Sequence, residues 1–465
     1  QARAGQALTC NDDWLAAAMA TLPFKLTAAQ QRALAAMLKD LAGPTPMCRL
    51  LQGDVGSGKT VVAVLALAIA ARNGAQGALM APTSILAEQH FQSVRALLSN
   101  IPDLDLGGDG LPAVRLLLGA TPQAERSELT AGLETGGVKI LIGTHALIQE
   151  SVEFSNLALA VVDEQHRFGV TQRAALREKG NEPHLLVMTA TPIPRSLALT
   201  AYGDLDLSVI DELPPGRRPV ETRVIYPLER QRAHNFVRAH IKKGRQAFLI
   251  FPLVEESEKM QEKAAVEEHD RLKKDVFPDL RLGLLHGKMK AVEKDAVMSN
   301  FRNGETDILV ATTVVEVGVD IPNASIMVVE GADRFGLAQL HQLRGRVGRG
   351  GQKSYCLLVS EGKNGRAPRS DDLSGERLKA MESITDGFVL AEKDLQLRGP
   401  GEFLGTRQAG FHLQWASLSD MALIDLTINE AEQILERDPQ LEQPKHHLLA
   451  EQAARSMQSG AGEIS

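Results

Sequence analysis

A glycine-rich run between an apolar stretch and a helical stretch limits the folds open to this chain. The run is Gly53-Asp54-Val55-Gly56-Ser57-Gly58-Lys59-Thr60, and it follows the short apolar segment Arg49–Leu51. Its glycines would let backbone N–H groups approach phosphate oxygens, and the helix N-terminus adds a favourable dipole. Lys59 would reach the terminal phosphates, and the Thr60 hydroxyl would face Mg²⁺. A strand, this loop and a helix in that order predict a phosphate-binding loop in an α/β fold.

Short apolar runs alternate with amphipathic stretches on both sides of Leu213–Pro219, which its Pro and Gly residues mark as a hinge or linker. The predicted strands of the first series are Arg49–Leu51, Gly77–Ala81, Val114–Leu118, Val138–Gly143, Leu157–Asp163 and His184–Thr189, with helices at Ser84–Leu98 and Pro122–Leu133. Those of the second series are Val220–Tyr226, Gln246–Phe251, Leu282–His286, Thr306–Ala311, Ser325–Val329 and Ser354–Val359. Strands that alternate with helices at this pitch predict two parallel sheets, each covered on both faces.

The domain organisation that we expect has five parts. Residues 1–21 form a linker helix, 22–212 a first lobe, 213–360 a second lobe, 361–450 a region with a helical hairpin, and 451–465 a disordered tail. The hairpin helices are expected at Glu376–Thr385 and Phe388–Leu395, after the polar loop Gly362–Asp372.

Composition excludes several classes of protein. The 3 cysteines are far apart in sequence, which excludes a disulfide framework and a Cys-x-x-Cys metal site, and favours a reducing, cytoplasmic location. No apolar run approaches the roughly 20 residues of a membrane span, so no membrane association is expected. Since the net charge is −7, any nucleic-acid binding has to use a local basic groove.

Two acidic residues end the apolar strand that begins at Leu157. A solvated strand end is the plain interpretation of such a pair. After a phosphate loop, however, the pair predicts metal and water chemistry: Asp163 would hold the Mg²⁺ shell, and Glu164 would activate the attacking water. The chain then continues with Gln165-His166, and His166 is predicted to couple the nucleotide site to the rest of the molecule.

Two further runs carry hydroxyl groups and arginines. Met188-Thr189-Ala190-Thr191-Pro192 ends a strand, and its two threonines are either turn caps or a relay from the nucleotide site. Gln342-Leu343-Arg344-Gly345-Arg346-Val347-Gly348-Arg349-Gly350 lies on the second lobe. Arginines on a helix are usually solvated, but glycines at this spacing would let them approach phosphate closely. We therefore predict that Arg346 and Arg349 act as arginine fingers across the cleft.

Together these motifs resemble the superfamily 2 helicases and translocases. The resemblance implies an α/β P-loop fold of two tandem RecA-like lobes with ATP between them. It also implies that Phe24 and Gln30 recognise the adenine, that Gln342 and Asp320 bind the nucleotide, and that Asp320 lies near the ribose. The residues that it assigns to DNA-backbone contact or to coupling are Thr83, Thr144, His166, Thr189, Thr191 and Thr312.

The stretch beyond both lobes resembles one family within this superfamily. Phe388–Leu395 runs into Leu397-Arg398-Gly399-Pro400-Gly401-Glu402-Phe403-Leu404-Gly405-Thr406-Arg407-Gln408, which looks like the translocation motif of the RecG family. This resemblance implies DNA contact or coupling roles for Arg398, Arg407 and Gln408. RecG proteins begin with a wedge domain that nothing before Leu22 can supply, so we expect this chain to be a helicase-core fragment.

The family implies an ATP-dependent, DNA-stimulated helicase that remodels stalled forks and branched recombination intermediates. Its implied cofactors are ATP and Mg²⁺, and its implied partners are forks, Holliday junctions and other double-stranded DNA, with single-strand DNA-binding protein as a further partner. A monomer in the bacterial cytoplasm, associated with the nucleoid, is expected. Two alternatives stay open: the motor of a transcription-repair coupling factor, and a non-catalytic ATP-binding scaffold.

Overall fold

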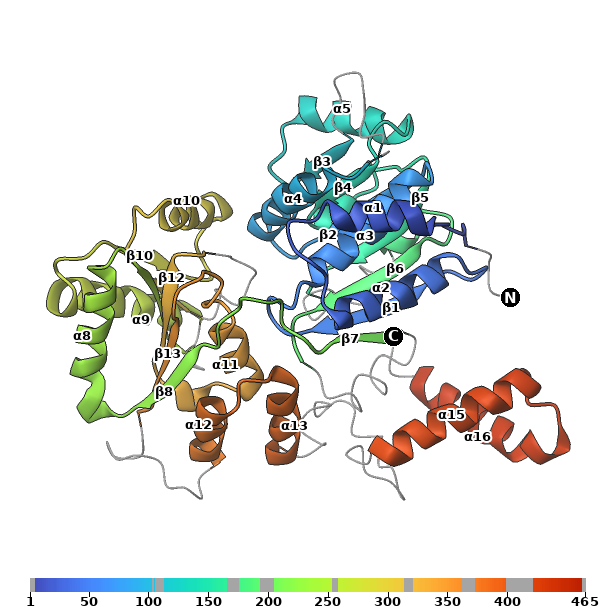
Figure 1. Ribbon diagram of the computed structural model, residues 1–465. Helices are drawn as coiled ribbons and strands as arrows, with labels where there is room; N and C mark the ends of the chain where they lie inside the picture. Colours follow the sequence, from blue (N-terminus) through green and yellow to red (C-terminus); the bar gives the residue numbers. More distant parts are fainter. Residues whose placement is uncertain are drawn as a thin grey trace. The chain divides into compact units, whose positions relative to one another are not determined.

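The computed structural model describes residues 5–102, 104, 113–164, 175–192, 205–252, 258–312, 321–361, 373–398 and 421–461. Two parallel sheets with helices packed against them organise most of these residues (Figure 1). The chain forms two compact units, one of Gln1–Ile193 with Gly203–Leu397 and one of Pro194–Tyr202 with Arg398–Ser465. Both sheets belong to the first unit, and the predicted pair of α/β lobes is confirmed.

The first sheet has seven strands in the order β3-β4-β2-β5-β6-β1-β7, and every adjacent pair is parallel. Parallel neighbours need crossover connections, which the helices between the strands supply. The predicted strands are confirmed to within two residues, whereas the short edge strand β7 has no counterpart in the prediction. The strands are β1 (Cys48–Gly53), β2 (Gln76–Met80), β3 (Val114–Leu117), β4 (Ile140–Gly143), β5 (Leu157–Val162), β6 (His184–Thr189) and β7 (Asp206–Ile210).

The first lobe is built around an almost wholly apolar helix, α3, which contacts α2, α4 and the sheet. Because α3 is apolar on every side, it is stable only when covered on all sides, and its residues Val61–Ala70 are buried against the sheet and neighbouring helices. Helix α4 coincides with the prediction, since Thr83 caps it. The helices are α1 (Asp12–Ala20), α2 (Ala28–Leu41), α3 (Lys59–Arg72), α4 (Ser84–Leu98), α5 (Gln123–Glu134) and the 3-10 turn η1 (His145–Ile148).

The leading segment packs on the first lobe. Leu8, Trp14 and Ala18 belong to the same buried core as α3, and the Trp14 Nε1 atom donates to the Pro102 carbonyl at 2.8 Å. The Arg72 guanidinium lies 4.8 Å from the centre of the Trp14 ring. The expected helix is present as α1, and its buried residues belong to the core of the lobe.

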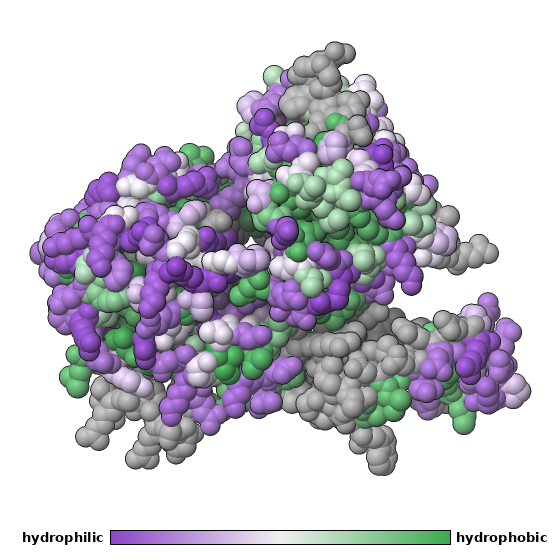
Figure 2. All heavy atoms as spheres, viewed as in Figure 1, coloured by the Kyte–Doolittle hydropathy of each residue, from purple (hydrophilic) through white to green (hydrophobic). Residues whose placement is uncertain are grey.

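The second sheet has six strands in the order β10-β11-β9-β12-β13-β8, again all parallel. Its strands are β8 (Glu221–Ile225), β9 (Gln246–Ile250), β10 (Leu282–Leu285), β11 (Ile308–Ala311), β12 (Ala324–Val329) and β13 (Tyr355–Val359). Its helices are α8 (Arg230–Ile241), α9 (Glu258–Arg271), α10 (Ala291–Arg302) and α11 (Leu337–Arg344), with short turns η3 (Pro227–Glu229), η4 (Leu272–Val276) and η6 (Ala332–Arg334). Hydrophilic residues cover most of the visible face of this lobe in Figure 2.

Two helices follow β13 and pack against this second sheet. Helix α12 (Leu373–Ser383) contacts β8, α11 and η6, and α13 (Gly387–Arg398) follows after a short turn. The two predicted helices are therefore confirmed, with shifted ends.

The other compact unit holds α15 (Met421–Arg437), η7 (Pro444–His446) and α16 (His447–Ala461). Asp438 closes the turn between them by accepting from Glu442 N and Gln443 N, each at 2.9 Å. Residues 451–461, where we expected a disordered tail, are helical. Among the described helices, none has both the length and the apolar composition that crossing a membrane requires.

Parallel strands bring their carboxyl ends to one edge of a sheet, and ligands bind at that edge in open α/β folds. In the first sheet, this edge gathers the ends of β1, β2, β4, β5 and β6. The residues that follow those ends are the phosphate loop, Thr83, Thr144, Asp163 with Glu164, and Thr191. The fold thus brings together motifs that are far apart in sequence.

Candidate nucleotide and coupling site

The phosphate loop wraps around the ammonium group of Lys59. The Lys59 Nζ atom donates to the carbonyls of Gly53 at 2.7 Å and Asp54 at 3.0 Å. Burial lowers the pKa of Lys59 below its usual range, although the nearby Glu164 and Asp163 carboxylates oppose the shift. Gly58 caps α3 with a φ of 83°, and a Cβ atom there would lie 2.2 Å from the Gln30 Nε2 atom. Only glycine fits this position.

Gln30, on α2, forms a hydrogen bond with the phosphate loop. Its Nε2 atom donates to the Ser57 carbonyl at 2.8 Å, and its Oε1 atom accepts from Thr27 N at 2.9 Å. The Phe24 side chain is 47% exposed. Both residues line the same cavity as the phosphate loop, and their adenine-recognition role stays a prediction.

Asp163 and Glu164 lie together at the end of β5, and both are buried. The Asp163 Oδ2 atom is 2.7 Å from His90 Nε2, and its Oδ1 atom accepts from Glu164 N at 3.0 Å. Burial by itself would raise the pKa of Asp163, but His90 and Lys59 lower it overall. His90 could not be chosen from local sequence patterns, since its contact with Asp163 spans 73 residues.

Glu164 has an unusual backbone as well as an unusual environment. Its φ is 53°, in the left-handed region that non-glycine residues rarely adopt and that clusters at functional sites. Burial and then repulsion from Asp163 raise the pKa of Glu164, against the attraction of Lys59 and Arg346. A carboxylate with a raised pKa is a better proton acceptor, as the predicted role requires.

A cavity of about 930 Å³ joins these groups to arginines of the second lobe. Its volume is within the range of sites that hold drug-sized ligands and cofactors. Arg346 is buried and electrostatically linked to Glu164, whereas Arg349 is half-buried and near Lys59. The predicted site residues that line the cavity are Phe24, Gln30, Val55, Gly56, Gly58, Lys59, Thr60, Asp163, Glu164, Arg346 and Arg349.

One glycine of the arginine segment makes room for the phosphate loop, and another has a left-handed backbone. A Cβ atom on Gly345 would lie 2.7 Å from the Val55 Cβ atom, and Gly348 has a φ of 83°. Gln342 is buried on α11 and is not among the cavity-lining residues. Arg217, in the segment between β7 and β8, donates to the Val55 carbonyl, a contact that the sequence did not suggest.

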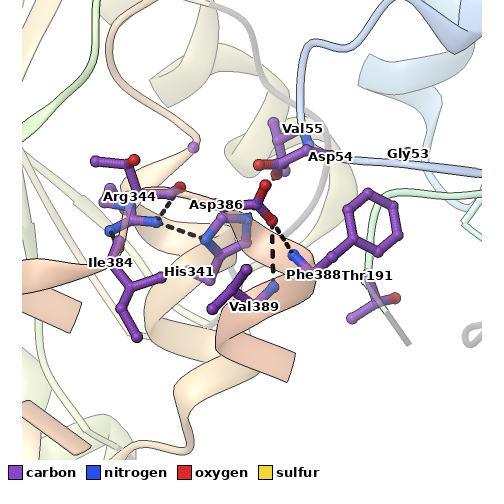
Figure 3. Close-up of polar contacts among 12 residues, drawn as sticks. Gly53, Asp54, Val55, Thr191, His341, Arg344, Ile384, Asp386, Phe388 and Val389 are labelled. Atoms are coloured by element: carbon purple, nitrogen blue, oxygen red, sulfur yellow. Dashed lines mark hydrogen bonds and ion pairs between the residues drawn. The ribbon is translucent and has the colours of Figure 1, made fainter. Parts of the chain in front are cut away.

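A chain of hydrogen bonds leads from the phosphate loop to the turn between α12 and α13 (Figure 3). The Asp54 Oδ1 atom is 2.6 Å from His341 Nε2, and His341 Nδ1 is 2.9 Å from an Arg344 NH2 group. Arginine can only donate, so His341 Nδ1 accepts and Nε2 carries the proton toward Asp54. Burial would raise the pKa of Asp54, but the hydrogen bond from His341 lowers it overall.

Arg344 continues this chain into the backbone of the turn. Its guanidinium donates to the carbonyls of Met381 at 3.1 Å, Ile384 at 2.8 Å and Thr385 at 2.9 Å. Asp386 then caps α13 by accepting from Phe388 N at 2.7 Å. His341 and Arg344 have buried side chains, and neither had been assigned a role from the sequence.

The predicted DNA-contact and coupling residues differ in their exposure. Thr144, Thr189 and Thr312 are buried, whereas Thr83 and Thr191 are partly exposed. Thr189 and Thr191 share a hydrogen bond between their hydroxyl oxygens at 2.9 Å, an arrangement compatible with either a relay or a capped turn. His166, Asp320, Arg407, Gln408 and the side chain of Arg398 lie outside the described residues.

Three helicase families match successive parts of the chain. Residues 27–200 match the DEAD/DEAH box helicase family, and residues 231–351 match the helicase conserved C-terminal domain. Residues 384–461 match domain 3, C-terminal, of the ATP-dependent DNA helicase RecG.

The curated relatives are similar over most of this chain. An ATP-dependent DNA helicase RecG from Synechocystis is 54% identical over 423 residues, which cover 90% of this chain and 49% of that protein. The proteins of the same name from Escherichia coli K12 and Bacillus subtilis are 49% and 46% identical, over 94% of this chain and 62% of each relative. The chain therefore spans less than two thirds of the length of each of these relatives.

Solved structures agree with these similarities. A RecG bound to a three-way DNA junction superimposes with a TM-score of 0.72 at 46% identity, over 86% of this chain and 51% of that one. The Mycobacterium smegmatis helicase Lhr bound to single-stranded DNA and AMP-PNP has a TM-score of 0.56 at 20% identity, over 80% of this chain and 49% of that one. The second similarity concerns the fold alone.

Proposed function

Because the chain belongs, over the length that it spans, to the RecG family of ATP-dependent DNA helicases, we propose that it is a DNA-stimulated ATPase that translocates on double-stranded DNA. The observation that carries this proposal is the cavity that the phosphate loop, Asp163 and Glu164 share with Arg346 and Arg349. Residues from both lobes thus surround one nucleotide-sized space, so hydrolysis there can be linked to movement of the lobes.

The residues around the loop fit a nucleotide with Mg²⁺. The loop residues Gly56, Gly58, Lys59 and Thr60 line the cavity, where backbone N–H groups and an ammonium can meet phosphate oxygens. Thr60 and Asp163 would hold the Mg²⁺, which in proteins uses one or two carboxylates together with phosphates. When bound, Mg²⁺ would neutralise charge on the phosphate oxygens.

In the proposed hydrolysis, Glu164 orients a water molecule and accepts its proton. The water oxygen bonds to the γ-phosphorus, the bond to the β,γ-bridging oxygen breaks, and ADP and phosphate result. Lys59, Arg346 and Arg349 stabilise the negative charge that spreads over the transferred group. Since Arg346 and Arg349 come from the second lobe, this stabilisation depends on lobe position.

We propose that the hydrogen bonds through His341 and Arg344 carry this dependence to α12 and α13. Those helices lead to Arg398 and to the segment with Arg407 and Gln408, which we assign to DNA contact or coupling. This assignment rests on the resemblance of the segment to the translocation motif, because its structure lies outside the described residues. Coupling through a packed element with two positions is a known way to link distant sites.

The proposed biological role is the remodelling of stalled forks and branched recombination intermediates, by fork regression and branch migration. A RecG relative has been solved on a three-way DNA junction, which supports branched DNA as the substrate. Single-strand DNA-binding protein as a partner, a monomeric state and a nucleoid-associated location are parts of the same proposal. The motor of a transcription-repair coupling factor is not favoured, since the C-terminal match is to RecG.

The decisive experiment measures ATP turnover and DNA translocation in the same preparation. Phosphate release is followed with and without duplex DNA, and translocation is followed by displacement of a third strand from a DNA triplex. We expect duplex DNA to stimulate turnover, and triplex displacement to require hydrolysable ATP. Turnover that ignores duplex DNA would contradict the motor, and no turnover at all would support the scaffold alternative.

A further inference from the structure

Helix α4 contributes a buried histidine to the edge of the nucleotide site. The His90 Nε2 atom lies 2.7 Å from the Asp163 Oδ2 atom, and the two side chains are 8% and 12% exposed. His90 also lines the cavity that holds Lys59 and Thr60. Buried polar groups are costly unless they are hydrogen-bonded, and His90 and Asp163 satisfy each other at the wall of the cavity.

The contact fixes the direction of the Asp163 carboxylate. His90 meets one carboxylate oxygen, and Glu164 N donates to the other at 3.0 Å. With each oxygen held by a partner, rotation of the carboxylate would break a hydrogen bond on either side. The remaining lone pairs are the ones available to a metal-bound water or ion.

The same helix begins at a predicted DNA contact. Thr83 caps α4 and accepts from Leu86 N at 3.3 Å. His90 is seven residues further on, which is close to two full turns, so Thr83 and His90 lie on the same side of α4. Roughly 10 Å of rigid helix separates the two positions. Val94 and Leu98, on the following turns, are buried in the first-lobe core and anchor the helix.

We propose that His90 is a positioning residue, which holds Asp163 in place for Mg²⁺ and ties it through α4 to the DNA-contact end at Thr83. This inference rests on the proposed function, because it takes Asp163 as the magnesium carboxylate and Thr83 as a DNA contact. Movement of Thr83 against DNA would then displace His90 and, with it, the Asp163 carboxylate. DNA would act on the metal shell within the first lobe, separately from the path through Arg344.

A purely structural pair is the competing explanation. Buried polar partners often stabilise a fold without any role in chemistry, and His184 is an example in this chain. His184 accepts from Met47 N through Nδ1 at 2.9 Å and is 2.8 Å from the Gln6 carbonyl through Nε2, away from the cavity. Two substitutions of His90 separate the explanations. The amide nitrogen of glutamine can reach the place of Nε2, whereas that of asparagine is too short.

The test uses the full chain with His90→Gln, His90→Asn and the exposed control Arg95→Ala on the same helix. The first readout is binding of Mn²⁺, as a probe for Mg²⁺, in the presence of AMP-PNP, measured by electron paramagnetic resonance. Loss of such an outer contact typically weakens metal binding about 10–100-fold. We expect this loss in His90→Asn, near wild-type binding in His90→Gln and Arg95→Ala, and unchanged AMP-PNP binding without metal.

The second readout is the ratio of ATP turnover with duplex DNA to turnover without it. We expect His90→Asn to lower this ratio, and His90→Gln to restore it. Unchanged Mn²⁺ affinity in His90→Asn overturns the inference, and so does an unchanged ratio of DNA-stimulated to basal turnover. Equal loss of Mn²⁺ binding in His90→Asn and His90→Gln, with a lowered melting temperature, also overturns it. The Mn²⁺ measurement needs no turnover, so it tests the role of His90 even if the wild-type chain hydrolyses no ATP. Absence of hydrolysis in the wild-type chain would count against the proposed function and not against the role of His90.

Discussion

The Asp54 carboxylate of the phosphate loop lies 2.6 Å from the His341 Nε2 atom, so a hydrogen bond between the partly buried Asp54 and the buried His341 joins the lobes. Asp54 was expected to serve the nucleotide as part of the loop. Its side chain instead points to α11, which also carries Arg344 (Figure 3). A change in the phosphate loop therefore has a direct route to the second lobe.

The Asp54–His341 contact has a predictable pH dependence. The pKa of Asp54 is lower in the folded state than in the unfolded state. The ionised carboxylate therefore stabilises the fold fully above the usual carboxyl pKa of about 3.9. The effect is lost as the pH falls through the lower folded-state pKa. We expect Asp54→Asn to lose about 1–2 kcal/mol of unfolding free energy at pH 7, because a hydrogen bond to a charged group becomes a neutral one.

Thermal melting of wild type and Asp54→Asn from pH 8 to pH 3 checks this expectation. The difference in stability should stay constant down to about pH 5 and shrink below about pH 4. A difference that grows as the pH falls would mean that the ionised carboxylate does not stabilise the contact.

ATP turnover is expected to depend on Lys59 and Glu164 in different ways. Lys59→Ala should abolish turnover, since the loop loses the buried ammonium group that would meet the terminal phosphates. Glu164→Gln should bind a fluorescent ATP analogue normally but stall hydrolysis, because only the proton-accepting carboxylate is lost. The exposed Glu134→Gln on α5 is the control. Turnover near wild type in Glu164→Gln would refute the assignment.

Arg346 and Arg349 should affect catalysis much more than binding. Both line the nucleotide cavity from the second lobe, and arginine fingers contribute about 10³–10⁵ in rate. Replacing either with alanine should lower turnover by orders of magnitude and leave analogue affinity nearly intact. The control is Arg334→Ala, which removes an exposed pair with Glu361 on the same lobe. Weak binding combined with normal turnover would reverse the interpretation.

The sequence predicted most of this fold because its signals are local. The helix α4 could be predicted to the residue, since Thr83 caps it and its apolar residues recur at helical spacing. The phosphate loop and the Asp163-Glu164 pair are equally local, and the structure brings them to one cavity. Strand β7 was not predicted, because its five residues carry only a short alternation of polar and apolar side chains.

The contacts that the sequence could not reveal are long-range. His90 meets Asp163 across 73 residues, and His341 meets Asp54 across 287. A single histidine in a helix of mixed polarity gives no sign of its partner until the fold is known. The leading segment shows the same limit: Trp14 resembles part of a linker until Pro102 and Arg72 are found beside it.

Arg344 provides the last test, because its side chain anchors the turn between α12 and α13. The guanidinium serves the carbonyls of Met381, Ile384 and Thr385 together, which the single nitrogen of lysine cannot do. In Arg344→Lys, Arg346 and Arg349 remain, so DNA-stimulated hydrolysis should persist. Translocation should fall at least tenfold, since the link to α13 is weakened.

Turnover and triplex displacement, measured in parallel with the melting temperature, separate coupling from stability. Arg334→Lys, which alters an exposed arginine of the same lobe, is the matched control. If Arg344 only stabilises the second lobe, both activities will fall together as the melting temperature drops. If it couples the lobes to α12 and α13, hydrolysis will continue while displacement falls at least tenfold, because the contact between α11 and the turn before α13 is weakened.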